Sequence, residues 1–316
     1  MTPIFPDSFP LGRYRLEWRV LTTVRLPEYA GSALRGVFGA SLRRLACLSG
    51  MTTCPGCPSL RSCPYASIFE TPSPPPAAGG KGFGVVPNPY IIEPPTWGSR
   101  AFEPGERLLF HLVLAGRALT QLPLLILAWQ RAMAYGVGPG DGKAELIRVV
   151  LETATGELEI HTPAGIGILD HPREVPLPPW PGGEELRLDL WTPTRIQRQG
   201  TPLGPGRLTP RDFLVTLMRR VNQIAALHGD GPVQADFAGL AALASEIRGR
   251  GNLSWRDWTR RSGRQRQLMA LGGVVGRWTL SGPLEAFWPF LYLGEWLHVG
   301  KNATFGLGGY RLEEPE

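Results

Sequence analysis

The sequence HVGKNATFGLGGYRL, residues His298–Leu312, places a glycine-rich loop between a predicted helix and a predicted final strand. Residues 284–297 are apolar and aromatic over a helical length, and Gly300 is expected to cap that helix. Residues 305–312 return to strand-forming side chains. This order excludes the Walker and dinucleotide loops, because those loops lead from a strand into a helix.

The loop itself has the composition of a phosphate-binding loop. Glycine allows sharp bends and lets backbone N–H groups come close to a ligand. Lys301 adds a cation, and it is one of only three lysines in the chain. The alternative is a tight turn that needs glycine for its geometry alone. The glycines expected to offer N–H groups are Gly306, Gly308 and Gly309.

Two segments resemble one known superfamily. The ending HVGKNATFGLGGYRL resembles the C-terminal glycine-rich signature of the RAMP superfamily of CRISPR-associated proteins, in particular the endoribonucleases that cut the precursor transcript into guide RNAs. Residues 27–39, PEYAGSALRGVFG, resemble the entry to the first helix in that superfamily. The resemblance implies an α+β fold of tandem ferredoxin-like (RRM-like) domains, and it makes RNA the expected ligand of the glycine loop.

The side-chain pattern predicts the same order of elements twice, the split βαβ order of a ferredoxin-like domain. In the first half, strands are predicted at 14–26, 89–93 and 107–115, one more strand or a hairpin at 144–160, and helices at 30–48 and 119–135. In the second half, strands are predicted at 185–192, 254–261, 267–281 and 305–312, and helices at 209–228, 237–247 and 284–297. Thr209 is the predicted N-cap of its helix, with Asp212 at the N3 position.

The predicted domains follow from this repetition. The first spans residues 1–171 and carries a cysteine-rich insertion at 47–63, a proline-rich linker covers 172–183, and the second domain spans 184–316. The net charge of +6 favours a polyanionic partner. No apolar run is long enough to span a membrane, and the first residues lack the features of a signal peptide, so we expect no membrane partner and a cytoplasmic location.

All four cysteines of the chain fall within seventeen residues. Thiols that cluster in this way in a reducing compartment are more typical of metal ligands than of disulfides. A saturated four-cysteine site would be structural, so the sequence predicts a structural zinc ion that catalysis does not need. An iron–sulfur cluster and unliganded thiols are the alternatives. The predicted ligands are Cys47, Cys54, Cys57 and Cys63.

The most basic segment, residues 248–266, lies between the predicted helix at 237–247 and the predicted strand at 267–281. A hairpin built from it would offer guanidinium groups to phosphates and the indoles of Trp255 and Trp258 to unpaired bases. The alternative is a solvated hairpin whose tryptophans pack inward. The predicted RNA-binding arginines of this segment are Arg248, Arg250, Arg256, Arg260, Arg261, Arg264 and Arg266, and those of the first helix are Arg35, Arg43 and Arg44.

Metal-independent RNA cleavage needs proton carriers at the 2′-OH and the 5′-oxygen and a cation at the phosphate. His298 is the predicted proton carrier, because it lies three residues before Lys301, the predicted cation. Nucleases of the resembling superfamily often place a histidine near the first helix, whereas this chain offers Tyr29 there. The alternatives are a helix-capping role for His298 and a packing role for Tyr29.

The resemblance implies an endoribonuclease that binds CRISPR repeat stem-loops and cleaves them through attack by the 2′-OH, giving guide RNA. Expected partners are repeat or guide RNA and other subunits of a CRISPR effector complex. The first alternative is a RAMP-type subunit that binds guide RNA without cutting it. The second is a zinc-stabilised protein unrelated to RNA.

Overall fold

The computed structural model describes residues 3–74, 86–95, 98–261 and 268–313. The chain folds as two compact units, one formed by Pro10–Val175 and the other by Met1–Phe9 with Pro176–Glu316. The first nine residues thus join the second unit, although the sequence assigned them to the first. No helix within the described ranges is long and apolar enough to cross a membrane.

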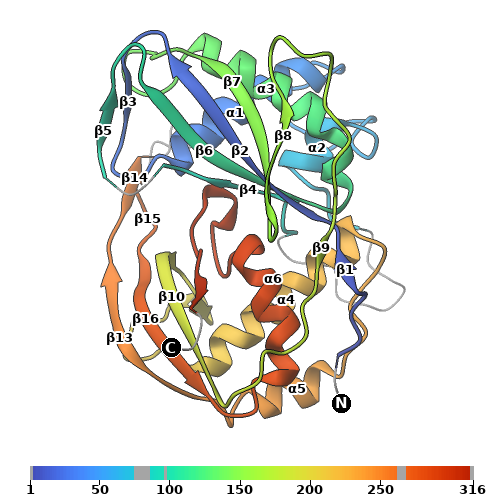
Figure 1. Ribbon diagram of the computed structural model, residues 1–316, viewed down its shortest axis with the longest axis vertical. Coiled ribbons are helices and arrows are strands. Elements are labelled where there is room, and N and C mark those ends of the chain that lie inside the picture. Colours follow the sequence, from blue (N-terminus) through green and yellow to red (C-terminus); the bar gives the residue numbers. More distant parts are fainter. Residues whose placement is uncertain (1–2, 75–85, 96–97, 262–267, 314–316) are drawn as a thin grey trace. The chain divides into compact units, whose positions relative to one another are not determined.

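The Pro10–Val175 unit contains a five-stranded antiparallel sheet in the order β4-β6-β2-β7-β8 (Figure 1). Leaving out the last strand, the chain connects the others in β-α-β-β-α-β order, as the sequence predicted. The strands are β2 (Leu11–Val20), β4 (Tyr90–Glu93), β6 (Arg107–Ala115), β7 (Ala144–Thr153) and β8 (Gly156–His161); β3 (Val24–Leu26) pairs with β5 (Arg100–Phe102).

Two helices cover one face of this sheet, α1 (Gly31–Ala46) and α3 (Leu122–Tyr135). Strand β2 alternates, so that Tyr14, Leu16 and Trp18 enter the core while Arg13, Arg15 and Glu17 lie on the opposite face. Phe38 of α1 stacks on Trp129 of α3 with ring centroids 4.7 Å apart, which places the core between helices and sheet. A 3-10 turn, η1 (Gly116–Gln121), precedes α3, and a short helix missed by the sequence pattern, α2 (Pro64–Phe69), follows the cysteine segment.

The opposite face of the sheet carries a network of ion pairs. Arg13 reaches the buried Glu93 at 2.6 Å, and Arg148 Nε contacts the buried Glu17 at 3.0 Å. His111 Nε2 lies 3.0 Å from the Glu152 carboxylate. Carboxylates buried in this way need such partners, because an unpaired buried charge is costly. The predicted strands contained all of these residues except Arg13, but no local pattern indicated their pairing.

The second unit contains a four-stranded sheet in the order β13-β16-β10-β17, with the same β-α-β-β-α-β connectivity. Helices α4 (Pro210–His228) and α6 (Trp288–Leu297) pack on one face, where Phe213 meets Trp278 and Tyr310 edge-on. The strands are β10 (Glu185–Thr194), β13 (Arg248–Arg256), β16 (Gly273–Ser281) and β17 (Arg311–Glu313). The α+β class with antiparallel sheets is therefore confirmed.

The N-cap of α4 was predicted correctly from the local sequence. Thr209 is the N-cap, its Oγ accepts from the Asp212 N–H at 3.2 Å, and the Asp212 carboxylate accepts in return from the Thr209 N–H at 3.2 Å. The remaining elements are short: β1 (Ser8–Phe9), β9 (Val175–Pro176), β11 (Gln197–Arg198), β12 (Thr201–Pro202), α5 (Phe237–Leu243), β14 (Thr259–Arg261), β15 (Leu268–Ala270) and η2 (Glu285–Phe287).

The end of the chain differs from the predicted boundaries. Helix α6 stops at Leu297 and its C-cap is His298, at φ 57°, rather than Gly300. Phe305 belongs to a 3-10 turn, η3 (Ala303–Phe305), and the final strand is only β17. Glycine content alone could not locate the cap, because the side-chain contacts of His298 are with Trp191 and Leu307, which lie outside the helix.

Candidate nucleic-acid interface

Three N–H groups of the glycine loop donate hydrogen bonds to acceptors within their own unit. The N–H of Gly306 donates to the Ala303 carbonyl at 2.7 Å, that of Gly308 to the Pro193 carbonyl at 3.0 Å, and that of Gly309 to Thr192 Oγ1 at 2.7 Å. These groups are therefore not available to a phosphate, which corrects the expectation drawn from the sequence. The loop matches the alternative of a turn that needs glycine for its geometry.

Close approach to Val299 and to the end of β10 explains the glycines. Gly308 lies at φ 75°, and a Cβ there would stand 1.8 Å from the Val299 carbonyl oxygen. A Cβ on Gly309 would meet the Trp191 ring at 2.9 Å and the His298 ring at 3.0 Å. Thr192 Oγ1 donates in turn to the Gly306 carbonyl at 2.9 Å. The loop is thus a tightly packed clasp on β10.

His298 is a structural part of this clasp. Its side chain is fully buried, its Nδ1 lies 3.2 Å from the Leu307 carbonyl oxygen, and its ring meets Trp191 edge-on at 6.0 Å. A proton carrier must reach the 2′-OH or the 5′-oxygen of the RNA, which a side chain enclosed in this way does not do. The geometry therefore fits the alternative of a residue that holds the helix end.

Lys301, in contrast, has an exposed side chain, and its backbone bonds to Arg195, a residue that the sequence did not single out. Its N–H donates to the Arg195 carbonyl at 2.9 Å, and the Arg195 guanidinium donates to the Gly272 carbonyl at 2.8 Å. Burial lowers the pKa of Arg195. Arg195 therefore joins the glycine loop to the start of β16. Only pairing between distant segments reveals this, because no motif surrounds Arg195.

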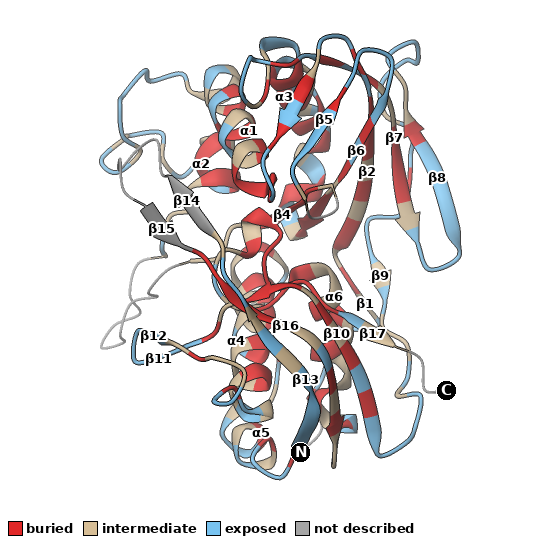
Figure 2. Cartoon of the chain, turned by 90° about the vertical axis from the view of Figure 1, so that its left-hand side faces the viewer, coloured by how far each residue is buried: buried red, intermediate tan, exposed pale blue. Residues whose placement is uncertain are grey.

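Strand β13 carries the predicted basic segment at the edge of the sheet. Arg248 pairs with Ser281, Arg250 with Thr279 and Arg256 with Gly273 of β16, so the three arginines share one face. All three are exposed, and β13 is coloured mainly as exposed in Figure 2. The intervening Gly249 and Gly251 face the helices, where a Cβ would collide with Trp278 or its backbone. The arginines thus lie on the face that helices α4 and α6 leave uncovered.

Neighbouring strands extend this basic face. Within the described part of the sheet, register places six arginines on it against three acids, Glu185, Asp189 and Glu313. Arg250 pairs with Glu185 at 2.9 Å, and both side chains are well exposed. Exposed ion pairs contribute only about 0–1 kcal/mol, so a phosphate can replace the carboxylate. The arginines that the sequence interpretation missed are Arg187, Arg277 and Arg311, the last lying 5.6 Å from the Trp191 ring centroid.

The predicted hairpin is confirmed, because β14 pairs with β15 beyond β13 and β16. Arg260 and Arg261 lie on β14, whereas Arg264 and Arg266 fall outside the described residues. The indole N–H of Trp255 donates to Asp257 at 2.7 Å, and Trp255 is opposite Val274 on the helix-facing side. This orientation fits the alternative of inward packing for Trp255.

The arginines of α1 have aromatic neighbours within the Pro10–Val175 unit. Arg35 donates to the Tyr90 hydroxyl at 2.9 Å and lies 4.1 Å from the Phe69 ring centroid. Arg43 donates to the Met51 carbonyl and lies over Tyr65, while the exposed Arg44 lies 5.1 Å from the ring centroid of Tyr135. These contacts orient the helix side chains, and an RNA-binding role for them stays a prediction.

Tyr29 is buried, with 2% of its surface exposed. Burial, and secondarily the Glu93 carboxylate, raise the pKa of Tyr29 well above its usual range. The hydroxyl therefore stays protonated near neutral pH and lies within the core of its unit. As with His298, the position fits the packing alternative rather than the catalytic one.

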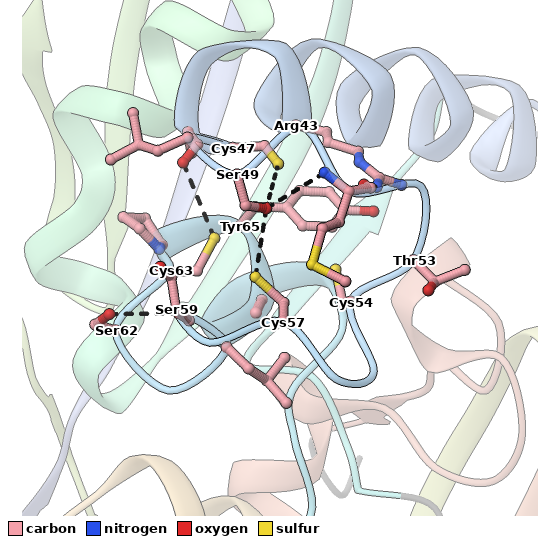
Figure 3. A pocket seen from close by; sticks show the side chains of 16 residues that line it. Arg43, Cys47, Ser49, Thr53, Cys54, Cys57, Ser59, Ser62, Cys63 and Tyr65 are labelled. Carbon is pink, nitrogen blue, oxygen red and sulfur yellow. Dashed lines mark hydrogen bonds between the residues drawn. The ribbon is translucent and has the colours of Figure 1, made fainter.

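The four cysteines line one pocket, together with Ser49, Ser59 and Ser62, and their sulfur atoms point into it (Figure 3). None of the four cysteines forms a disulfide bond. Burial, followed by the Glu70 carboxylate, raises the pKa of Cys54 to about 11, whereas a hydrogen bond with Ser49 and backbone contacts lower the pKa of Cys47. Across the described ranges, no three His, Cys, Asp or Glu side chains already stand in an arrangement that could hold a metal ion.

Comparison with known proteins adds to this geometry. A family model described as CRISPR-associated endoribonuclease Cas6 matches residues 188–310, and a second, described as an N-terminal domain, matches residues 9–172. No curated protein matches the chain.

Solved structures are similar over nearly the whole length. "Cas6 (TTHB231) product complex" is 19% identical with a TM-score of 0.59, covering 96% of this chain and 99% of that chain. "Cas6 (TTHA0078) product complex" is 21% identical with a TM-score of 0.53 and the same coverage. "Thermus thermophilus Cas6 (TTHB231)" is 18% identical with a TM-score of 0.52, covering 98% and 100%. These likenesses show a common fold. Within that fold, residues 188–310 match the family of the CRISPR-associated endoribonuclease Cas6.

Proposed function

We propose that this protein is an endoribonuclease that binds the repeat stem-loops of CRISPR precursor RNA and cuts them to give guide RNA. The observation that carries the proposal is the match of residues 188–310 to CRISPR-associated endoribonuclease Cas6, over the domain whose uncovered sheet face carries the exposed arginines. Planar guanidinium groups suit phosphates, since they donate two parallel hydrogen bonds. The two β-α-β-β-α-β units would serve as paired ferredoxin-like modules acting in the cytoplasm.

The proposed reaction needs no metal ion. The 2′-oxygen attacks the adjacent phosphorus and loses its proton, the bond from phosphorus to the 5′-oxygen breaks, and that oxygen takes up a proton. The products are a 2′,3′-cyclic phosphate and a 5′-hydroxyl. Lys301 is the proposed electrostatic contributor, because its exposed ammonium group can stabilise the charge on the phosphorane. Arg195 would hold the Lys301 backbone close to Gly272, which lies between β15 of the hairpin and β16.

A cleavage assay in EDTA tests this proposal. Purified protein is incubated with its repeat RNA, and we expect one cut that disappears when the nucleotide before the scissile phosphate carries a 2′-deoxyribose. A parallel thermal unfolding curve in EDTA shows whether the protein stays folded during the assay. Tight binding of RNA that remains intact, by protein that remains folded, would contradict the enzyme and support a guide-RNA-binding subunit.

We also propose that the protein remains with its product and joins other CRISPR proteins. Support comes from similar folds in larger assemblies: a chain of a "Partial Cas6-RT-Cas1--Cas2 complex" is 16% identical with a TM-score of 0.59, covering 99% of this chain and 47% of that chain. Affinity purification from the native cell, with and without ribonuclease treatment, would identify partners. Recovery of the protein with neither guide RNA nor another CRISPR protein would contradict this.

A further inference from the structure

The cysteine segment brings four thiols together from positions that the chain fixes at both ends. Cys47 is the C-cap of α1 and its N–H donates to the Arg43 carbonyl at 2.9 Å. Cys63 is the N-cap of α2, whose Ile68 and Phe69 belong to the core. The first and last thiols therefore sit at the ends of two packed helices, and they face one pocket of about 100 Å³.

The two central thiols stand on a tight turn. The Cys57 N–H donates to the Cys54 carbonyl at 3.0 Å, and Gly56 between them lies at φ 83°. Proline followed by a glycine at positive φ is the arrangement of a type II turn, which closes Cys-Pro-Gly-Cys into a knuckle. A knuckle of this kind can present two thiolates to one ion.

Two of the thiols share a polar neighbour in the pocket, while Cys54 and Cys63 also pack against the core. The Sγ atoms of Cys47 and Cys57 lie 3.7 Å and 3.3 Å from the same hydroxyl, that of Ser49. Cys63 Sγ lies 3.9 Å from the Ala46 carbonyl oxygen. These are weak partners, so rotating the thiols toward a common centre gives up little, and staggered side-chain positions offer such rotations.

We propose that Cys47, Cys54, Cys57 and Cys63 bind one zinc ion in tetrahedral coordination, which joins the end of α1 to the start of α2. Between the two helices, residues 48–62 form turns and bends but no helix or strand, so the segment has little regular structure of its own. Four thiolates saturate zinc, so the ion would stabilise the fold and take no part in RNA cleavage. The side chains as described must rotate to reach this geometry.

Metal content tests the site directly in the full chain. Protein prepared under reducing conditions without chelator should contain about one zinc per chain after gel filtration. Cys54→Ser and Cys57→Ser should each lose it. Ser62→Ala is the matched control, because Ser62 lines the same pocket but donates to the Ser59 carbonyl rather than contacting a thiol, and it should retain the zinc.

Wild-type protein gives a second readout that does not depend on the folding of the variants. After zinc removal and refolding, added Co²⁺ should give the absorption spectrum of a tetrahedral tetrathiolate site, and all four thiols should become protected from alkylation. Reduced wild-type protein that lacks zinc and fails to bind Co²⁺ would overturn the proposal. Stoichiometric iron and sulfide, or disulfides among the four cysteines in protein free of metal, would overturn it equally.

Discussion

At the scale of single residues, the structure separates chemical groups that a motif places together. His298 and Lys301 are three positions apart, yet His298 is enclosed against Trp191 while the Lys301 side chain is exposed. The separation arises because His298 is held at positive φ by the clasp on β10. Of these two residues, Lys301 is therefore the one whose side chain could contact RNA under the proposed function.

Lys301→Ala is expected to slow cleavage by about 10²–10³-fold, the usual effect of removing one preorganised group at a developing negative charge. RNA affinity should change much less, because one phosphate contact is lost among many. Single-turnover kinetics and filter binding measure the two effects. Lys143→Ala is the matched control, since it removes an exposed lysine from the other unit. Equal cleavage rates in the two variants would remove Lys301 from the site.

Gly308→Ala should destabilise the second unit by at least about 2 kcal/mol, because the new Cβ enters a left-handed backbone position and collides with the Val299 carbonyl. Thermal unfolding measures the loss. In the control Gly204→Ala the Cβ meets nothing within 4 Å and the melting temperature should barely move. A wild-type melting temperature for Gly308→Ala would show that the loop has room for a Cβ beside the Val299 carbonyl.

At the scale of elements, the local sequence determines where a helix begins and which side chains share one face of a strand. Whether that face is covered or exposed depends on the elements that pack beside the strand. The capping box of α4 is encoded entirely by Thr209, Asp212 and the proline between them. Strand β13 instead places its arginines on an uncovered face because it pairs with β16, whose Trp278 faces the helices.

Thr209→Ala should destabilise the protein by about 1 kcal/mol through loss of the cap. Burial would raise the pKa of Asp212, but hydrogen bonds from Arg198 and Thr209 outweigh it and lower that pKa. A depressed folded pKa gives stability that is present above the unfolded pKa of about 3.9 and lost as pH falls through the folded value. The loss of stability caused by Thr209→Ala should therefore be smaller in acid.

Urea unfolding at pH 7 and below pH 4 measures this loss of stability, with Thr201→Ala as the control. A loss that is the same at both pH values would contradict the role of Asp212.

Replacing Arg248 and Arg256 together by Gln should weaken RNA binding about tenfold at moderate salt and flatten the plot of log affinity against log salt by about 0.7–0.9 per lost phosphate contact. Arg211 and Arg219 of α4 form the matched control pair, since both are exposed on the helical side of the same unit. An equal loss in the control pair would show that total charge, and not the sheet face, governs binding.

At the scale of the whole molecule, the chain does not divide at the predicted linker alone. The first nine residues belong to the unit formed by Pro176–Glu316. The Ile4 N–H donates to the Gln234 carbonyl at 2.8 Å, and the Phe5 ring meets Phe290 of α6 edge-on at 4.9 Å. The second unit is thus built from both ends of the sequence.

Phe5→Ala should destabilise that unit by the free energy of the buried apolar surface that is lost and by about 0.5–1.5 kcal/mol more, because it also removes one aromatic pair. Hydrogen exchange followed by mass spectrometry should show faster exchange in α6, with little change in the Pro10–Val175 unit. Ile4→Ala is the control, since the Ile4 side chain is 72% exposed. Faster exchange confined to the Pro10–Val175 unit would contradict the assignment of the N-terminus.

The sequence by itself determined the features that depend on neighbours along the chain. Strand β6 and helix α3 end where periodicity places their ends, the capping box of α4 is where Thr209 predicts it, and the cysteines cluster because they are close in sequence. Tertiary structure alone decided which groups are accessible. His298 and Tyr29 are buried by contacts between segments far apart in the chain. Contacts of the same kind bond the N–H groups of Gly308 and Gly309 to β10 and the Arg195 side chain to the Gly272 carbonyl. Such contacts leave no periodic trace, because the partner that buries a side chain or accepts its hydrogen bond lies outside any local window.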